Sequence, residues 1–267
     1  MKTLACLLPL ALAAAVATPA AAQSQTGYFD LVRPDPPGVP ANRLRVGASL
    51  LSGAAWPGAR ERDTRPWPLL DWRGEGFFAS TVDGLGWGLR PDCAVNFGPR
   101  ITVDTGRSER RHDRLRGWGH VPMRAEAGLF ASAAPWAGGM LGASWRHGST
   151  AGGGGDVVDL GAGQSVPLGG DWFAGVEVVA SWADARHERA YFGIDAAQSA
   201  ASGLAPHAIG AGWRDLRSSL SLVRLIAPGL AAVATLRDDR LLGATRDSPV
   251  SERDRSTALI ATLAWTF

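Results

Sequence analysis

A serine, a histidine and an aspartate lie close together near the middle of the sequence, and these residue types could build a hydrolase site. Ser144 or Ser149 would be the nucleophile, His147 the general base, and Asp156 the carboxylate that orients the base. Their spacing matches no local catalytic motif, and any chain of this length offers such a trio. We therefore predict no catalytic residue and no enzyme activity.

Residue types that bind metals or cofactors show no useful spacing either. The five histidines are His112, His120, His147, His187 and His207. His187 precedes Glu188, but the second histidine of a zinc-binding helix is missing. The glycines at 152–155 lack the lysine and the serine or threonine that complete a phosphate-binding loop, so they indicate a flexible external loop. We expect no metal and no cofactor.

Arginines crowd residues 105–120. They are Arg107, Arg110, Arg111, Arg114 and Arg116, with Glu109 and Asp113 among them. The planar guanidinium group suits phosphate, so this segment could grip lipopolysaccharide head groups. The alternative is a solvated loop whose charges pair with one another, and the mixed charge favours that alternative.

The elements that would carry these residues are β-strands, and residues 172–182 show this most clearly. Even positions from Trp172 to Trp182 are all apolar, whereas the odd positions include Glu177 and Ser181. At ~3.3 Å per residue and a tilt near 40°, this face covers about 25 Å, the apolar band of an outer-membrane barrel. Tryptophans at both ends would lie at the two membrane interfaces, which a soluble sandwich does not explain.

The same alternation recurs along the chain. It appears at residues 44–50, 97–103, 123–133, 137–145, 158–162, 230–236 and 259–265. Charged positions on the other face would line a lumen, namely Arg45, Arg100, Arg124, Glu126, Glu177 and Arg214. Residues 127–145 carry no charge and could suggest a transmembrane helix, but their proline and glycines favour two strands joined at Ala134-Pro135.

The lengths of the connections predict the number of strands. Long segments near 53–65, 105–120, 148–155, 184–208 and 240–255 alternate with short turns near 82–84, 134–135, 168–170 and 227–228. Long external loops and short periplasmic turns are typical of outer-membrane barrels. We predict an all-β, antiparallel up-and-down transmembrane barrel of ten strands, with residues 85–104 as one strand interrupted by Pro91. If that segment is a hairpin, another is hidden nearby and the barrel has twelve strands.

The longest connection, residues 184–208, has the pattern of a loop with a short helix. Asp195 is placed to cap the start of that helix, and Gly203 lies near its end. Tyr191 and Phe192 would anchor the loop over the barrel rim. We favour a structural plug over a ligand site for this segment.

The first residues fit a secretory signal peptide, with a basic Lys2, an apolar run and Ala20-Ala21-Ala22 before Gln23. Without it, 26 arginines (27 Lys+Arg less Lys2) face 25 acidic residues, which excludes a nucleic-acid footprint. Cys93 would be the only thiol, so no internal disulfide can form. We divide the chain into a signal peptide (1–22), a proline-rich periplasmic lead-in (23–42) and an outer-membrane barrel (43–267).

The last residues add an argument for location in the outer membrane. Apolar positions alternate back from Phe267 through Trp265 and Leu263 to Leu259. The outer-membrane assembly machinery recognises a terminal strand of this pattern.

Two blocks of sequence resemble a known family. The first is YFGI at residues 191–194, continued by AQSAASGL at 197–204, and the second is RLLG at 240–243 followed by DSP at 247–249. With the terminal strand, they make the chain similar to the MipA/OmpV family of outer-membrane proteins. The first loop, AWPG at 55–58, departs from the tyrosine-and-glycine pattern usual there.

The resemblance implies a barrel without catalytic activity. One member of that family binds a murein lytic transglycosylase and helps to assemble it with a murein synthase, and others are associated with adhesion or envelope stress. We therefore expect a non-enzymatic scaffold that contacts outer-membrane lipid and lipopolysaccharide and recruits peptidoglycan-remodelling enzymes. A small-solute channel and a surface adhesin acting through its loops are the alternatives, although the lumen of ten strands is narrow.

Overall fold

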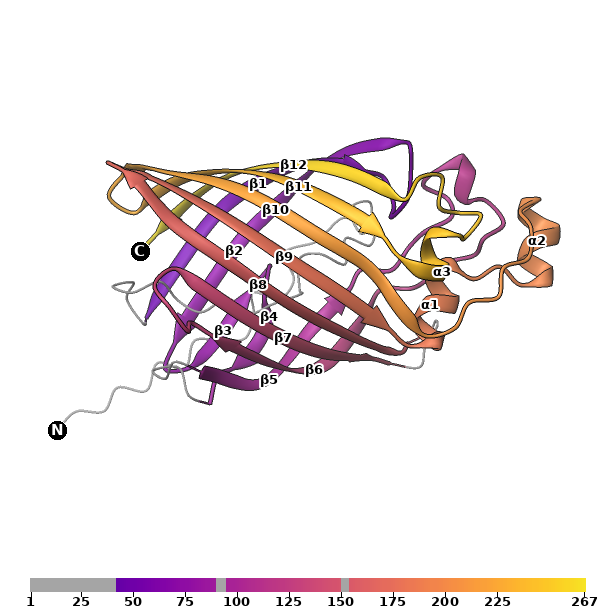
Figure 1. The fold of residues 1–267 in the computed structure, drawn as a ribbon, viewed down its shortest axis with the longest axis horizontal. Coiled ribbons are helices and arrows are strands. Elements are labelled where there is room, and N and C mark those ends of the chain that lie inside the picture. Colours follow the sequence, from indigo (N-terminus) through magenta and orange to yellow (C-terminus); the bar gives the residue numbers. More distant parts are fainter. Residues whose placement is uncertain (1–41, 90–94, 150–153) are drawn as a thin grey trace, which may run out of the picture.

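The computed structural model describes residues 42–89, 95–149 and 154–267, which form a closed antiparallel β-barrel (Figure 1). Within these ranges there are twelve strands, and β1 pairs with β12 to close the barrel. The strands are β1 (Arg43–Ala54), β2 (Arg62–Gly74), β3 (Phe77–Ser80), β4 (Gly84–Trp87), β5 (Val95–Asp104), β6 (Arg124–Ala133), β7 (Gly139–Gly148), β8 (Asp156–Gly169), β9 (Trp172–Ala183), β10 (Gly212–Ala227), β11 (Leu230–Leu241) and β12 (Arg255–Thr266). The helices are α1 (Ala185–Phe192), α2 (Ala196–Ser202), α3 (Gly243–Arg246) and a 3-10 turn at Asp113–Leu115.

Side chains alternate between the outer surface and the lumen, as the sequence predicts. On β9, Val176 and Val178 are exposed on the outer surface, whereas Val179 and Ser181 are buried on the inner side. Trp172 and Trp182 lie at opposite ends of this strand. The outer face therefore carries the apolar belt that contacts lipid.

The two ends of the barrel differ in their connections. At one end the connections are long, including residues 55–61, 105–123, 184–211 and 242–254, and they hold the three helices (Figure 1). At the other end they are short, at residues 75–76, 134–138, 170–171 and 228–229. Long loops mark the external side of such barrels, so Phe267 lies at the periplasmic end.

Among the described residues, no helix is both long enough and apolar enough to cross a membrane. The predicted signal peptide and nearly all of the lead-in lie outside the described residues, as do Pro91 and residues 150–153 of the glycine-rich loop.

The prediction of ten strands is wrong, and the alternative of twelve is correct. The hidden hairpin turns at Glu75 and Gly76, whose φ values are 51° and 86°. Positive φ at both central residues suits the twist of a two-residue hairpin, but asparagine or glycine usually marks the first position, and here it is glutamate. Residues 85–104 contain β4 and β5, which pair at Leu85 and Ile101. The turn at 81–83 therefore joins the externally directed ends of the short strands β3 and β4, and it is not a periplasmic turn.

The external loops pack together over the barrel mouth into an external cap with its own apolar core. Its buried members are Ala55, Trp56, Ala59, Leu115, Trp118, Val121, Tyr191, Phe192, Ile194, Ile209, Leu241 and Val250. The Trp56 indole N–H donates to the carbonyl of Val250 (3.2 Å), and that of Trp118 donates to the carbonyl of Gly193 (2.9 Å). Each of these tryptophans thus ties two loops together that are distant in sequence.

Candidate functional site

The candidate site is the charged part of the lumen below the external cap. Arg146 of β7 lies 3.0 Å from a carboxylate oxygen of Glu126 on β6 and 2.8 Å from one of Asp159 on β8. Asp159 also accepts a hydrogen bond from Ser181 of β9 (2.6 Å) and lies 3.7 Å from Arg217 of β10. All five side chains are buried, so each charge depends on its neighbours to offset the cost of leaving water. We call these five side chains and the charged side chains in contact with them the lumen network.

A β-bulge in β10 brings two consecutive charged residues into the lumen network. The register between β9 and β10 shifts between Trp213 and Asp215. Trp213 is exposed on the outer face, while Arg214 and Asp215 are both buried and joined by a 2.6 Å hydrogen bond. A bulge redirects side chains in this way. Simple alternation places Arg214 in the lumen but would turn Asp215 outward, so the sequence pattern missed Asp215.

Helix α1 closes the lumen network from above. The carboxylate of Asp184 caps the helix by accepting from two backbone N–H groups of its first turn. The hydroxyl of Tyr191 donates to Asp104, and the His187 ring stacks on Tyr191 with centroids 4.8 Å apart. Burial, followed by the nearby arginines, holds the pKa of His187 well below its usual value. The neutral ring therefore accepts from Arg214 through Nε2 (3.1 Å).

The predicted short helix in this loop is confirmed. Asp195 and Gln198 form a reciprocal capping box at the start of α2, and Gly203 ends it in the left-handed conformation. Tyr191 and Phe192 are each only 3 % exposed and belong to the external cap. The plug interpretation of this segment agrees with their burial.

The arginines of the arginine-rich loop, residues 105–120, differ in burial and in the groups they contact. Arg107 is buried, its guanidinium carbon lies 3.2 Å from the centre of a Trp118 ring, and burial lowers its pKa to about 9. Arg116 is exposed and pairs with Asp113 at 2.7 Å. These two arginines do not share a phosphate-sized site, and they favour the loop of self-paired charges.

One group of side chains has the spacing of a metal site. Single ligand atoms of Asp104, Glu126 and His187 all lie within 4.8 Å of one another, and all three residues are buried. The histidine was not singled out in sequence because its partners are more than 60 positions away. Each ligand already faces an arginine: Asp104 lies 2.6 Å from Arg124, Glu126 faces Arg146, and His187 faces Arg214. A divalent cation does not fit among these three positive charges.

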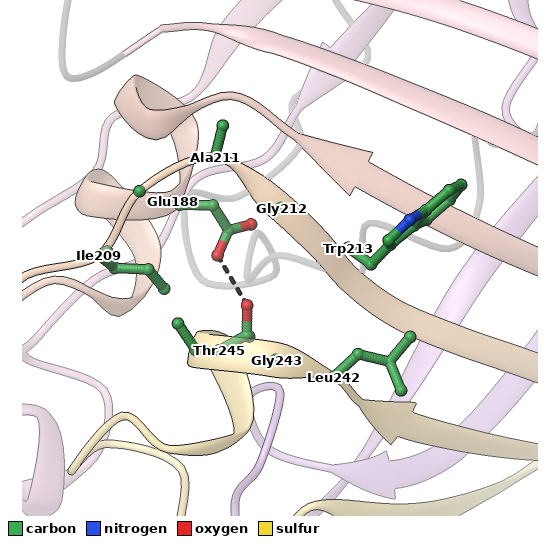
Figure 2. A pocket seen from close by; sticks show the side chains of 10 residues that line it. Glu188, Ile209, Ala211, Gly212, Trp213, Leu242, Gly243 and Thr245 are labelled. Carbon is green, nitrogen blue, oxygen red and sulfur yellow. Dashed lines mark hydrogen bonds between the residues drawn. The ribbon is translucent and has the colours of Figure 1, made fainter.

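A cavity of about 510 Å³ lies beside the lumen network, between residues 209–213 and 242–245. Figure 2 shows Glu188 of α1 pointing into it, with one carboxylate oxygen accepting from Thr245 of α3 (2.8 Å). The other oxygen, Oε1, has no hydrogen-bond partner in the described part of the chain. Burial raises the pKa of Glu188 to about 7, although Arg214 opposes that effect. Nothing in the local sequence pattern marks this glutamate.

The residues of the imagined hydrolase do not meet. Ser144 faces the lumen and accepts from Arg100, whereas His147 and Asp156 pair at 2.9 Å outside it. Ser144 and His147 are three positions apart on β7, so their side chains lie on opposite faces of the strand and cannot act together. Of the predicted lumen residues, Arg100, Arg124, Glu126 and Arg214 are buried, and Arg45 and Glu177 are half-buried.

Comparison with known proteins identifies one family and several solved structures that are similar to this chain. The family described as MltA-interacting protein MipA matches residues 46–267. No curated protein matches the chain. Among solved structures, the NanC porin is 10% identical, with 83% of this chain and 98% of the porin covered and a TM-score of 0.47. An outer-membrane channel from Pseudomonas putida F1 is 12% identical, with 87% and 99% covered and a TM-score of 0.42. Likeness at this level says nothing about what the chain binds.

The family match covers most of the chain, and it agrees with the closed barrel and its apolar outer belt. This protein is therefore a β-barrel of the bacterial outer membrane and belongs to the MltA-interacting protein MipA family.

Proposed function

We propose that this protein is a membrane-anchored scaffold that holds a murein lytic transglycosylase, and through it a murein synthase, at the periplasmic face of the outer membrane. The observation that carries the proposal is the match to the MltA-interacting protein family over residues 46–267. A partner that works on peptidoglycan can reach only the periplasmic end of the barrel. That end offers short turns with exposed side chains, among them Glu75, Trp136 and Asp171.

The state of the lumen supports a scaffold rather than a small-solute channel. An aqueous pore needs hydrated polar walls, whereas Asp159 and Arg146 are 0 % and 3 % exposed and bonded to each other. The external cap adds an apolar layer above them. Planar-bilayer recordings should therefore show no conductance steps, and regular steps would favour the channel instead.

Photocrosslinking in intact cells tests the scaffold directly. A photoreactive residue at Glu75 or Asp171 should capture a murein lytic transglycosylase. The same residue at Ala200, on the exposed surface of external helix α2, should not. Faster migration of unboiled samples on a denaturing gel shows that each variant has folded. If folded variants with the periplasmic probes capture other envelope proteins but no murein enzyme, the proposal is wrong.

A further inference from the structure

The barrel wall is incomplete on its external half between β2 and β5. β2 pairs with β1 along its full length, but β3 pairs only with residues 71–74 of β2. β4 in turn reaches β5 only at Gly86–Arg100 and Leu85–Ile101. Within the described ranges, residues 62–70 of β2 and 102–104 of β5 therefore have no strand beside them on this side.

We call this opening the side window, and described residues border it both below and above. Its lower border is the tip of the β3–β4 hairpin at 81–83, which lies toward the periplasmic half of the barrel (Figure 1). Its upper border is the arginine-rich loop, where His112 lies 2.9 Å from Glu61 at the external end of β2. From Asp63 to Trp67, beyond the contacts of Thr81 with residues 68–70, the open edge runs for about 13 Å along the strand, or about 10 Å of height at a 40° tilt.

The chemistry of the β2 edge suits permanent contact with lipid. The backbone of Leu70 faces the window, because its N–H donates to the Thr81 hydroxyl (3.1 Å) and its carbonyl accepts from the Thr81 N–H (2.8 Å). Alternate residues of a strand direct their backbone groups the same way, so Pro68 and Pro66 also face the window. Neither proline has an N–H, and the Pro68 carbonyl accepts from the Thr81 hydroxyl at 2.9 Å. The edge thus exposes few unpaired backbone donors, which are costly in a bilayer.

The prolines also decide which occupant the window can take. An added β-strand, from a second copy or another protein, needs backbone donors along this edge, and Pro66 and Pro68 remove two of them. The window is instead continuous with the apolar belt, since Leu70, Ile101 and Val103 on its outer borders are 42 %, 51 % and 40 % exposed. A hydrocarbon chain is the occupant that this surface meets in the membrane.

The inner side of the window also differs from the lumen network. The β2 residues that face inward there include Trp67 and Leu69, and both are half-buried. Below them, Phe78 and Phe130 form a buried edge-to-face pair with centroids 5.5 Å apart. Trp67 and Leu69 thus form an apolar stretch of the inner wall, between the Asp63–Arg65 pair above and the Asp71–Arg73–Asp83 group below.

We infer that an acyl chain of a membrane lipid enters the barrel wall through the side window and binds against Trp67 and Leu69. The site is independent of the scaffold role, which concerns the periplasmic turns. The apolar core of the external cap lies above the lumen, whereas access from the side does not require the loops to open.

Photolabelling by lipid tests this site. The full-length protein is placed in nanodiscs of phosphatidylcholine that carries a diazirine near the end of its acyl chain, irradiated, and mapped by mass spectrometry. Label is expected on inward-facing Trp67 and Leu69 as well as on outward-facing Leu70. Inward-facing Val179 should stay unlabelled, because β9 has a partner strand on each side. Label confined to outward-facing residues would overturn the inference.

A second test places a charged side chain where the acyl chain is proposed to enter. Leu69→Asp should reduce the labelling of Trp67 at least several-fold, and Ser165→Asp, a matched inward-facing change on β8, should leave it unchanged. Both variants must keep the gel mobility of the folded barrel. Equal labelling of Trp67 in both variants would contradict the proposed path. Labelling of Trp67 that arises only after removal of residues 23–41 would assign the window to that segment and also overturn the inference.

Discussion

Replacing Glu188 by glutamine should change how the stability of the barrel depends on pH. The folded protein raises the pKa of this carboxyl group from 4.5 to about 7, mainly through burial. Three charged groups modify the effect: Arg214 lowers the pKa, while Asp215 and Asp184 raise it. The Thr245 hydroxyl also favours the ionised form through its hydrogen bond.

The sign follows from proton linkage. Because the folded state binds the proton of Glu188 more tightly than the unfolded state, its contribution to stability is fully present below pH 4.5. It declines as the pH rises and is lost above about pH 7. The difference between the two pKa values corresponds to about 3 kcal/mol. Glu188 is 1 % exposed, so solvent screening reduces this figure little.

Chemical denaturation in detergent micelles at pH 5, 6, 7 and 8 measures the effect. The free energy of unfolding of Glu188→Gln, minus that of the unchanged protein, should rise by up to about 3 kcal/mol over this range, since glutamine cannot ionise. Glu75→Gln removes the same charge at an exposed periplasmic turn and should give a flat difference. A flat difference for Glu188→Gln as well would refute the assignment of a buried, protonated carboxyl group at this position.

Three further substitutions test the packing of the lumen. Asp159→Asn should lower the free energy of unfolding by about 3–5 kcal/mol, because it removes one of the two carboxylates that face each of the buried residues Arg146 and Arg217, and denaturant titration measures this. Tyr191→Phe should cost about 1–3 kcal/mol in the same assay, because it removes a buried hydroxyl donor, and a loss below 0.5 kcal/mol, roughly, would show that this bond contributes little. Gly128→Ala should impair folding on unboiled gels, because a methyl group there overlaps the backbone carbonyl of Trp145, while Gly175→Ala, where the methyl group would lie 3.7 Å from the carbonyl oxygen of Gln164, should fold normally.

The regular part of the barrel was predictable because strand alternation is local. The outward face of residues 172–182 and the inward positions of Arg100, Arg124 and Glu126 follow from period-two spacing alone. The caps of α2 were also predictable, since Asp195 and Gly203 act within their own turn. Each of these features depends on residues that are neighbours in the chain.

Features that depend on departures from regularity were missed. Glu75 adopts a positive φ at a turn position where asparagine or glycine is usual, which hid one hairpin and changed the strand count. The bulge before Asp215 turned a charge inward against the alternation. The hydrogen bond between Glu188 and Thr245 connects two external loops, and its residues are 57 positions apart in the sequence, so no local pattern encodes it.

The shared core of the external cap makes the loops interdependent as surfaces for antibodies, phages and engineering. A change in one loop that disturbs Trp56 or Trp118 would also loosen the loop to which each indole is bonded. Helix α2 is different, because none of its residues is buried and a capping box holds it at its start. A reporter epitope displayed on the cell surface therefore belongs in α2, where it can vary in sequence while the cap beneath stays closed.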